Sequence, residues 1–173
     1  MKKIVFSLLT TVVCAALTGC GILASQPHLP VTELEGAVCE INYSGKAYSA
    51  VITNTTADMT TVSFTSPPSL EGMVCTYSSD GCKITFGSLN FYTERPLPEN
   101  SALPRLIYSI LHNAVSENAF PPDSVISEKT TACFRGMADG YSYTLTTDLS
   151  TGRLIKISSS QAKLDINLLQ QAS

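Results

Sequence analysis

The segment GMVCTYSSDGCKITFGS, residues 72–88, contains the clearest strand pattern of the chain. Apolar and polar residues alternate along its two arms, with the apolar positions at Met73, Cys75 and Tyr77 and then at Cys82, Ile84 and Phe86. Such alternation is typical of strands with one buried face, and an Asp-Gly pair between two such runs favours a tight hairpin turn. We therefore predict an antiparallel hairpin whose turn contains Asp80-Gly81, which would set Cys75 opposite Phe86.

The same period of two continues on both sides of this hairpin. Before it, the alternating segments are AVCEINY (37–43), KAYSAVITNT (46–55) and MTTVSFTSPP (59–68). After residue 130 the alternating segments are ACFRGMADG, YSYTLTTDLSTG, RLIKISSS and a last run that ends at Leu168. Turn residues separate these runs, at Asp139-Gly140 and at 150–152 for example. We expect the runs to form an antiparallel sheet.

Between the two groups of strands the apolar period changes to that of a helix. In SALPRLIYSILHNAVSE (101–117), apolar residues recur at spacings of three and four, at Leu103, Leu106, Ile107, Ile110, Leu111 and Ala114. They form one stripe of an amphipathic helix, which we expect near residues 101–117 and against one face of the sheet. The predicted fold class is therefore α+β. The interface is either a filled core or an apolar groove, whose candidate lining residues are Leu103, Leu106, Ile107, Ile110 and Leu111.

The N-terminus has the layout of a secretory signal peptide. Two lysines precede an apolar run from Ile4 to Leu17, which is shorter than the about 20 residues that a membrane-spanning helix needs. The sequence LTGC that ends at Cys20 resembles a bacterial lipobox, in which the cysteine receives a diacylglycerol and the preceding residues are removed. We expect lipidation at Cys20, loss of residues 1–19, and a protein held by its acyl chains on the extracytoplasmic side of a cell membrane.

Removal of residues 1–19 leaves enough chain for one domain with a core. We expect a lipidated cysteine and tether at residues 20–34, followed by a single domain at 35–169. The formal net charge would fall from −3 to −5, because the removed segment carries two lysines and no acid. An acidic domain without a basic cluster disfavours nucleic acid as a partner and leaves membrane attachment to the acyl chains.

The sequence offers little material for catalysis. The two histidines are His28, in the tether, and His112, on the predicted helix, and neither has a second ligand at metal-binding spacing. Several acidic residues, among them Asp139 and Asp148, fall at predicted turns, where an aspartate bonds nearby backbone. We therefore predict no enzymatic activity, no catalytic residue, no metal and no cofactor.

Four cysteines lie in the predicted domain: Cys39, Cys75, Cys82 and Cys133. Three of them fall on the apolar parity of a strand and one at a strand start, which suits small core residues and disulfides equally well. Export permits disulfides, and the even count is compatible with them. The predicted hairpin register does not place Cys75 directly across from Cys82, so the sequence leaves the redox state open.

The order of elements resembles the LolA/LolB-like lipoprotein-carrier superfamily over roughly Glu35 to Leu168. The matching features are the meander, VSFTSPPSLEGM (62–73) where relatives have Phe-x-x-Pro-x-x-Leu-x-Gly, the amphipathic helix, and YSYTLTTDLSTGRLIKIS (141–158). The resemblance implies a curved antiparallel sheet, an incomplete barrel, with helical structure on its concave side and an apolar cavity between the two.

Two functions are compatible with these features. The first is that of a non-catalytic, lipid-anchored cell-envelope protein that binds a hydrophobic small molecule or lipid between sheet and helix. The alternative is an envelope assembly or interaction protein that offers a sheet face or a strand edge to a partner protein.

Overall fold

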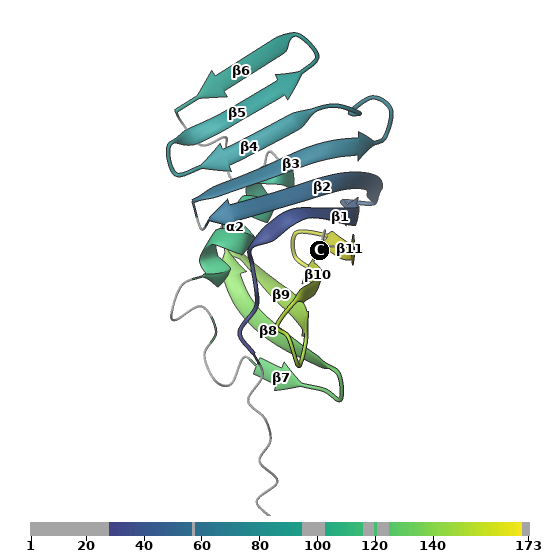
Figure 1. Cartoon of the computed structure of the whole chain (residues 1–173), viewed down its shortest axis with the longest axis vertical. Coiled ribbons are helices and arrows are strands. Elements are labelled where there is room, and N and C mark those ends of the chain that lie inside the picture. Colours follow the sequence, from purple (N-terminus) through teal and green to yellow (C-terminus); the bar gives the residue numbers. More distant parts are fainter. Residues whose placement is uncertain (1–27, 57, 95–102, 116–119, 121–124, 171–173) are drawn as a thin grey trace, which may run out of the picture.

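The chain forms a single antiparallel sheet of eleven strands with one described helix (Figure 1). The computed structural model describes residues 28–56, 58–94, 103–115, 120 and 125–170. The strands are β1 (Leu34–Tyr43), β2 (Lys46–Thr56), β3 (Met59–Ser66), β4 (Val74–Ser78), β5 (Gly81–Phe86), β6 (Leu89–Thr93), β7 (Val125–Ser127), β8 (Thr131–Ala138), β9 (Tyr141–Asp148), β10 (Leu154–Ser159) and β11 (Leu164–Gln170). The helix is α2 (Leu103–Ala114).

The sheet consists of two meanders joined in the middle. Strands β1 to β6 follow one another from the centre to one edge, and β11 back to β7 run from the centre to the other edge. The pairing of β1 with β11, from Cys39 opposite Leu168 to Tyr43 opposite Leu164, unites the two halves. The mainly antiparallel architecture of the predicted α+β fold is thereby confirmed.

The sheet curves around α2. The helix packs on β3 and β4 of the first meander and on β8 of the second, although six other strands lie between β4 and β8 in the sheet. Neighbouring strands lie about 4.8 Å apart, so in a flat sheet such strands would be too far apart for one helix of about 10 Å diameter to contact both. The apolar parities of both meanders therefore meet at a common core that includes the helix.

The observed helix agrees with the predicted stripe. It covers Leu103–Ala114, and the remaining residues of the predicted range, 101–102 and 116–117, lie outside the described part. Its apolar stripe is buried, and Ile107, Ile110 and Leu111 are at most 1% exposed. The helix is thus an integral part of the core.

The register of the β4–β5 hairpin differs from the predicted one. Tyr77 pairs with Cys82 and Ser78 with Gly81, so Ser79 and Asp80 form the turn, and Cys75 faces Ile84 instead of Phe86. Gly81 lies in β5 and not in the turn, and its lack of a side chain matters for the packing of β6. A Cβ atom on Gly81 would collide with the backbone carbonyl of Thr93 on β6, so glycine is required for the close approach of the two strands.

Packing begins before the predicted domain start at Glu35. The amide of Val31 donates a hydrogen bond to the carbonyl of Gly152 (2.9 Å), and Val31 forms an isolated parallel bridge with Arg153. The carbonyl of Thr32 accepts a hydrogen bond from Asn54 Nδ2 (2.9 Å). The end of the predicted tether is therefore fixed against the β9–β10 turn.

Candidate functional site

The five residues of the predicted apolar groove are all buried. Their exposed fractions are 6% or less, and none of the five lines either of the two cavities described below. The residues are Leu103, Leu106, Ile107, Ile110 and Leu111. These five side chains belong to the hydrophobic core of the described structure, and their role in lining an apolar groove stays a prediction.

A small cavity of about 240 Å³ lies at the edge of this core, between α2 and the β4–β5 turn. The Nε atom of Arg105 lies 3.5 Å from Asp139 Oδ2, and the hydroxyl of Ser109 donates a hydrogen bond to the same oxygen (2.7 Å). Asp139 belongs to the predicted Asp-Gly turn between β8 and β9, but its carboxylate fastens that turn to the helix. The charge of Arg105 is thereby balanced within the cavity wall.

Aromatic rings stack along the wall of this cavity. The buried ring of Tyr77 stacks on Tyr108 at 6.3 Å, and Tyr108 stacks on His112 at 5.4 Å. The Tyr77 hydroxyl has no partner at normal hydrogen-bond geometry among the described residues. Burial, followed by the neighbouring Cys82, raises the pKa of Tyr77 far above its ordinary value, so the phenol stays protonated at physiological pH.

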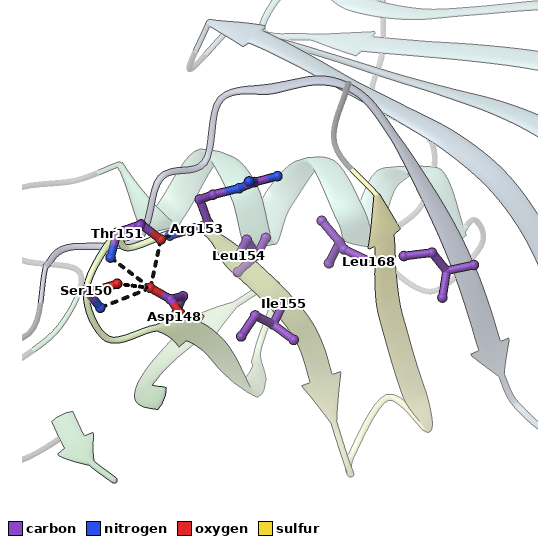
Figure 2. Close-up of a pocket in the computed structure, with 8 residues that line it drawn as sticks. Asp148, Ser150, Thr151, Arg153, Leu154, Ile155 and Leu168 are labelled. Carbon is purple, nitrogen blue, oxygen red and sulfur yellow. Dashed lines mark hydrogen bonds between the residues drawn. The ribbon is translucent and has the colours of Figure 1, made fainter. Parts of the chain in front are cut away.

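A second cavity, of about 350 Å³, opens between the first residues of β10 and the last residues of β11 (Figure 2). Polar and apolar residues line it in equal numbers. The lining residues are Leu154, Ile155, Leu168 and Leu169, together with Asp148, Ser150, Thr151 and Arg153. We call it the wedge, because the two neighbouring strands part where it lies.

Asp148 has a structural role on the rim of the wedge. Its Oδ1 atom accepts hydrogen bonds from the backbone amides and hydroxyls of Ser150 and Thr151, at 2.6–3.0 Å (Figure 2). The Ser150 hydroxyl, followed by the bonds from Thr151, lowers the pKa of Asp148 to about 2. The carboxylate therefore stays ionised and holds its own turn, as predicted for a turn aspartate.

Exposed apolar residues gather at the other end of the sheet, on the β5–β6 hairpin. Ile84, Phe86, Leu89 and Phe91 share the parity of the buried Cys75 and Cys82, because Ile84 pairs with both Cys75 and Phe91, and Phe86 pairs with Leu89. Leu89 is 71% exposed and Phe91 53%. We call the four residues Ile84, Phe86, Leu89 and Phe91 the shelf.

The shelf continues the core face of the sheet beyond the helix. The helix packs on β3, β4 and β8, whereas β6 is the edge strand and most of its residues are exposed. Strands β6 and β7 were not predicted from the sequence, although Leu89 and Phe91 of β6 alternate with polar Asn90 in SLNFYT. The signal was present but shorter than the runs from which the other strands were predicted.

The four domain cysteines are free thiols, and three of them are buried. Burial raises the pKa of Cys39 to about 12 and that of Cys75 to about 11. Cys39 donates a weak hydrogen bond from Sγ to the carbonyl of Ala37 (3.3 Å). Cys39 and Cys75 therefore behave as small core residues, and their raised pKa values disfavour the reactive thiolate form.

Metal clusters and membrane-spanning helices are absent from the described ranges. There, no group of three or more His, Cys, Asp or Glu side chains is arranged to hold a metal ion. No described helix has both the length and the apolar character needed to cross a membrane. Cys20, the predicted lipidation site, lies outside the described residues.

No family model matches the chain, and no curated protein matches it significantly. Similar solved structures include an uncharacterized conserved protein from Thermus thermophilus, with 11% identity, 83% of this chain and 81% of that one covered, and a TM-score of 0.49. A LolA superfamily protein from Nitrosomonas europaea has 10% identity, coverages of 79% and 69%, and a TM-score of 0.37. A domain from Vibrio parahaemolyticus, named as an outer membrane lipoprotein-sorting protein, has 11% identity, coverages of 79% and 83%, and a TM-score of 0.40. These TM-scores lie below 0.5, so a function for this chain has to be inferred from its own side chains.

Proposed function

We propose that this chain is a non-catalytic, lipid-anchored protein of the bacterial cell envelope, which binds an apolar ligand such as a lipid acyl chain on the shelf. The observation that supports the proposal is the exposure of Phe86, Leu89 and Phe91 on the core face of the sheet, beyond the strands that α2 covers. Contiguous exposed apolar side chains are uncommon on soluble proteins unless something binds there. The five predicted groove residues belong to the hydrophobic core, whereas the shelf is exposed, so we place the ligand on the shelf.

The side chains of the shelf can supply useful affinity. Full burial of a large apolar side chain contributes about 1.5–3 kcal/mol, so covering the exposed half of one contributes about 1 kcal/mol. Removing two such side chains should weaken binding by about 2 kcal/mol, which is more than tenfold in Kd. Since the shelf is open on one side, we expect it to accept a flexible chain in preference to a rigid ligand of fixed shape.

Binding of a fluorescent fatty acid to the purified protein tests this site. The Leu89→Ser/Phe91→Ser variant should bind at least tenfold more weakly than the parent. A matched control is Tyr92→Ser, because Tyr92 is 59% exposed on the opposite face of the same strand. Equal binding by all three proteins, or no binding by the parent, would refute the ligand site.

The anchor is tested separately, by fractionation of cells and mass spectrometry of the N-terminal peptide. We expect Cys20 to be the first residue and to carry acyl chains, and Cys20→Ala to release the protein from membranes. An intact, unlipidated N-terminus would contradict this part of the proposal. Ligand binding by the shelf does not depend on the result.

The strand edge supports a second candidate, the binding of a partner protein. Strand β6 lies at the edge of the sheet, and its residues from Leu89 to Tyr92 are exposed and uncharged. An exposed edge strand can pair with an extended segment of another chain. Crosslinking in intact cells through a photoreactive residue at position 90 would distinguish the two: a reproducible protein adduct, with no fatty-acid binding in vitro, favours this second function.

A further inference from the structure

The polypeptide enters the domain directly beside the wedge. Val31 is bonded to Gly152 and bridged to Arg153, and Arg153 lines the wedge. A Cβ atom on Gly152 would collide with the carbonyl oxygen of Leu29, so the segment before Val31 also lies close against this turn. The N-terminal segment therefore joins the folded domain at this corner.

The wedge exists because β10 and β11 pair over only part of their lengths. Their register covers Lys156–Ser159 of β10 and Leu164–Asn167 of β11. Ahead of Lys156, β10 instead follows β9, with a register shift between Leu154 and Lys156. Beyond Asn167, β11 stays with β1. The parting strands expose side chains of both sheet faces to one opening (Figure 2).

Exposed apolar side chains surround the entry point. Leu29 is 74% exposed, Val31 40%, Ile155 40% and Leu169 56%. We call these four residues, together with Arg153, the root patch. Two charged residues, Asp148 and Arg153, line the wedge, and the Asp148 carboxylate accepts the hydrogen bonds of its own turn. An apolar patch with a cation on its rim matches the layered chemistry of a lipid surface, where acyl chains lie below phosphates.

We infer that the root patch rests on the bilayer, with Ile155 and Leu169 among the outer acyl carbons and Arg153 at the level of the phosphates. The inference depends on the lipid anchor of the proposed function. Eight peptide units separate Cys20 from His28, and they span at most about 29 Å when fully extended. His28, next to Leu29 of the root patch, would therefore lie within that distance of the lipidated cysteine.

Tryptophan fluorescence tests this orientation, because the chain contains no tryptophan of its own. Leu169→Trp places a single reporter in the root patch. Met137→Trp is the matched control, because Met137 is 62% exposed and lies at the other end of the β8–β9 hairpin from Asp148. The full-length lipidated variants would be reconstituted into phosphatidylcholine vesicles with unlabelled or brominated acyl chains, and flotation of the vesicles would report on the anchor.

We expect both proteins to float with the vesicles, and brominated lipid to remove most of the Leu169→Trp emission while leaving that of Met137→Trp nearly unchanged. Adding Ile155→Asp should abolish the quenching without affecting flotation, and an unchanged melting curve would show that the variant remains folded. Flotation with equal or no quenching of the two reporters would overturn the docking and leave the anchor intact. Failure to float would overturn the anchor and the docking together.

Discussion

Removal of the Asn54 side chain should destabilise the domain and loosen its N-terminal end. Asn54 is 2% exposed and bridges two segments: its Nδ2 donates to the carbonyl of Thr32 (2.9 Å), and its Oδ1 accepts from the hydroxyl of Thr60 (2.7 Å). Both partners are buried. In Asn54→Ala, the Thr60 hydroxyl and the Thr32 carbonyl would lose these bonds in a place that water reaches poorly.

The magnitude can be estimated from these two groups. Leaving a buried polar group unpaired costs about 1–3 kcal/mol, so the expected loss in the free energy of unfolding is about 3 kcal/mol. For a domain of this size each kcal/mol corresponds to roughly 3 °C, which predicts a fall in Tm of about 10 °C. Thr60→Val removes the hydroxyl that Asn54→Ala leaves unpaired. The double variant should therefore lose about 1–2 kcal/mol less in the free energy of unfolding than the sum of the two single losses.

Urea unfolding followed by circular dichroism measures these differences, with Asn167→Ala at an exposed position of β11 as the control. Hydrogen exchange of the Val31 amide should also become faster, because the Asn54–Thr32 hydrogen bond fixes the neighbouring residue. A loss below about 0.5 kcal/mol for Asn54→Ala, as expected of an ordinary surface change, would show that the bridge does not hold the segment. Strict additivity of Asn54→Ala and Thr60→Val would show that the two side chains are not coupled.

Three further predictions concern the core, the wedge and the thiols. Ile110→Asp places an unpaired charge in a site that is 1% exposed and should abolish the cooperative melting transition; a parent-like melt would mean that the helix stripe is not buried. Because its folded pKa of about 2 lies below the ordinary 3.8, Asp148 stabilises the fold above that ordinary value, and this contribution disappears as pH falls towards 2. Carbon NMR titration should show the low pKa, and Ser150→Ala should raise it. In native protein, iodoacetamide should modify the half-buried Cys133 before the fully buried Cys39, and the reverse order, by mass spectrometry, would contradict the packing described here.

The individual elements were predictable because their patterns are local. The alternation in YSYTLTTD and the stripe from Leu103 to Ala114 each depend on one segment that buries a single face, and both elements formed as predicted. The Asp139-Gly140 turn was also predictable, because both residues adopt positive φ angles, 48° and 80°, which this pair tolerates. Membrane anchoring through Cys20 remains a prediction from the sequence.

The pattern of one segment does not determine how far two strands stay paired. The observed hairpin register places Gly81 against Thr93 of β6, and the packing before Glu35 involves Asn54 and Gly152, which lie far from Val31 in sequence. The same applies to the wedge and the shelf. The wedge forms where β10 and β11 choose different neighbours, and the shelf is exposed because α2 packs on β3, β4 and β8 instead of on the hairpin at the edge. A single segment determines which of its faces is apolar, whereas the relative placement of segments determines whether that face is covered, because burial is a property of the contacts between them.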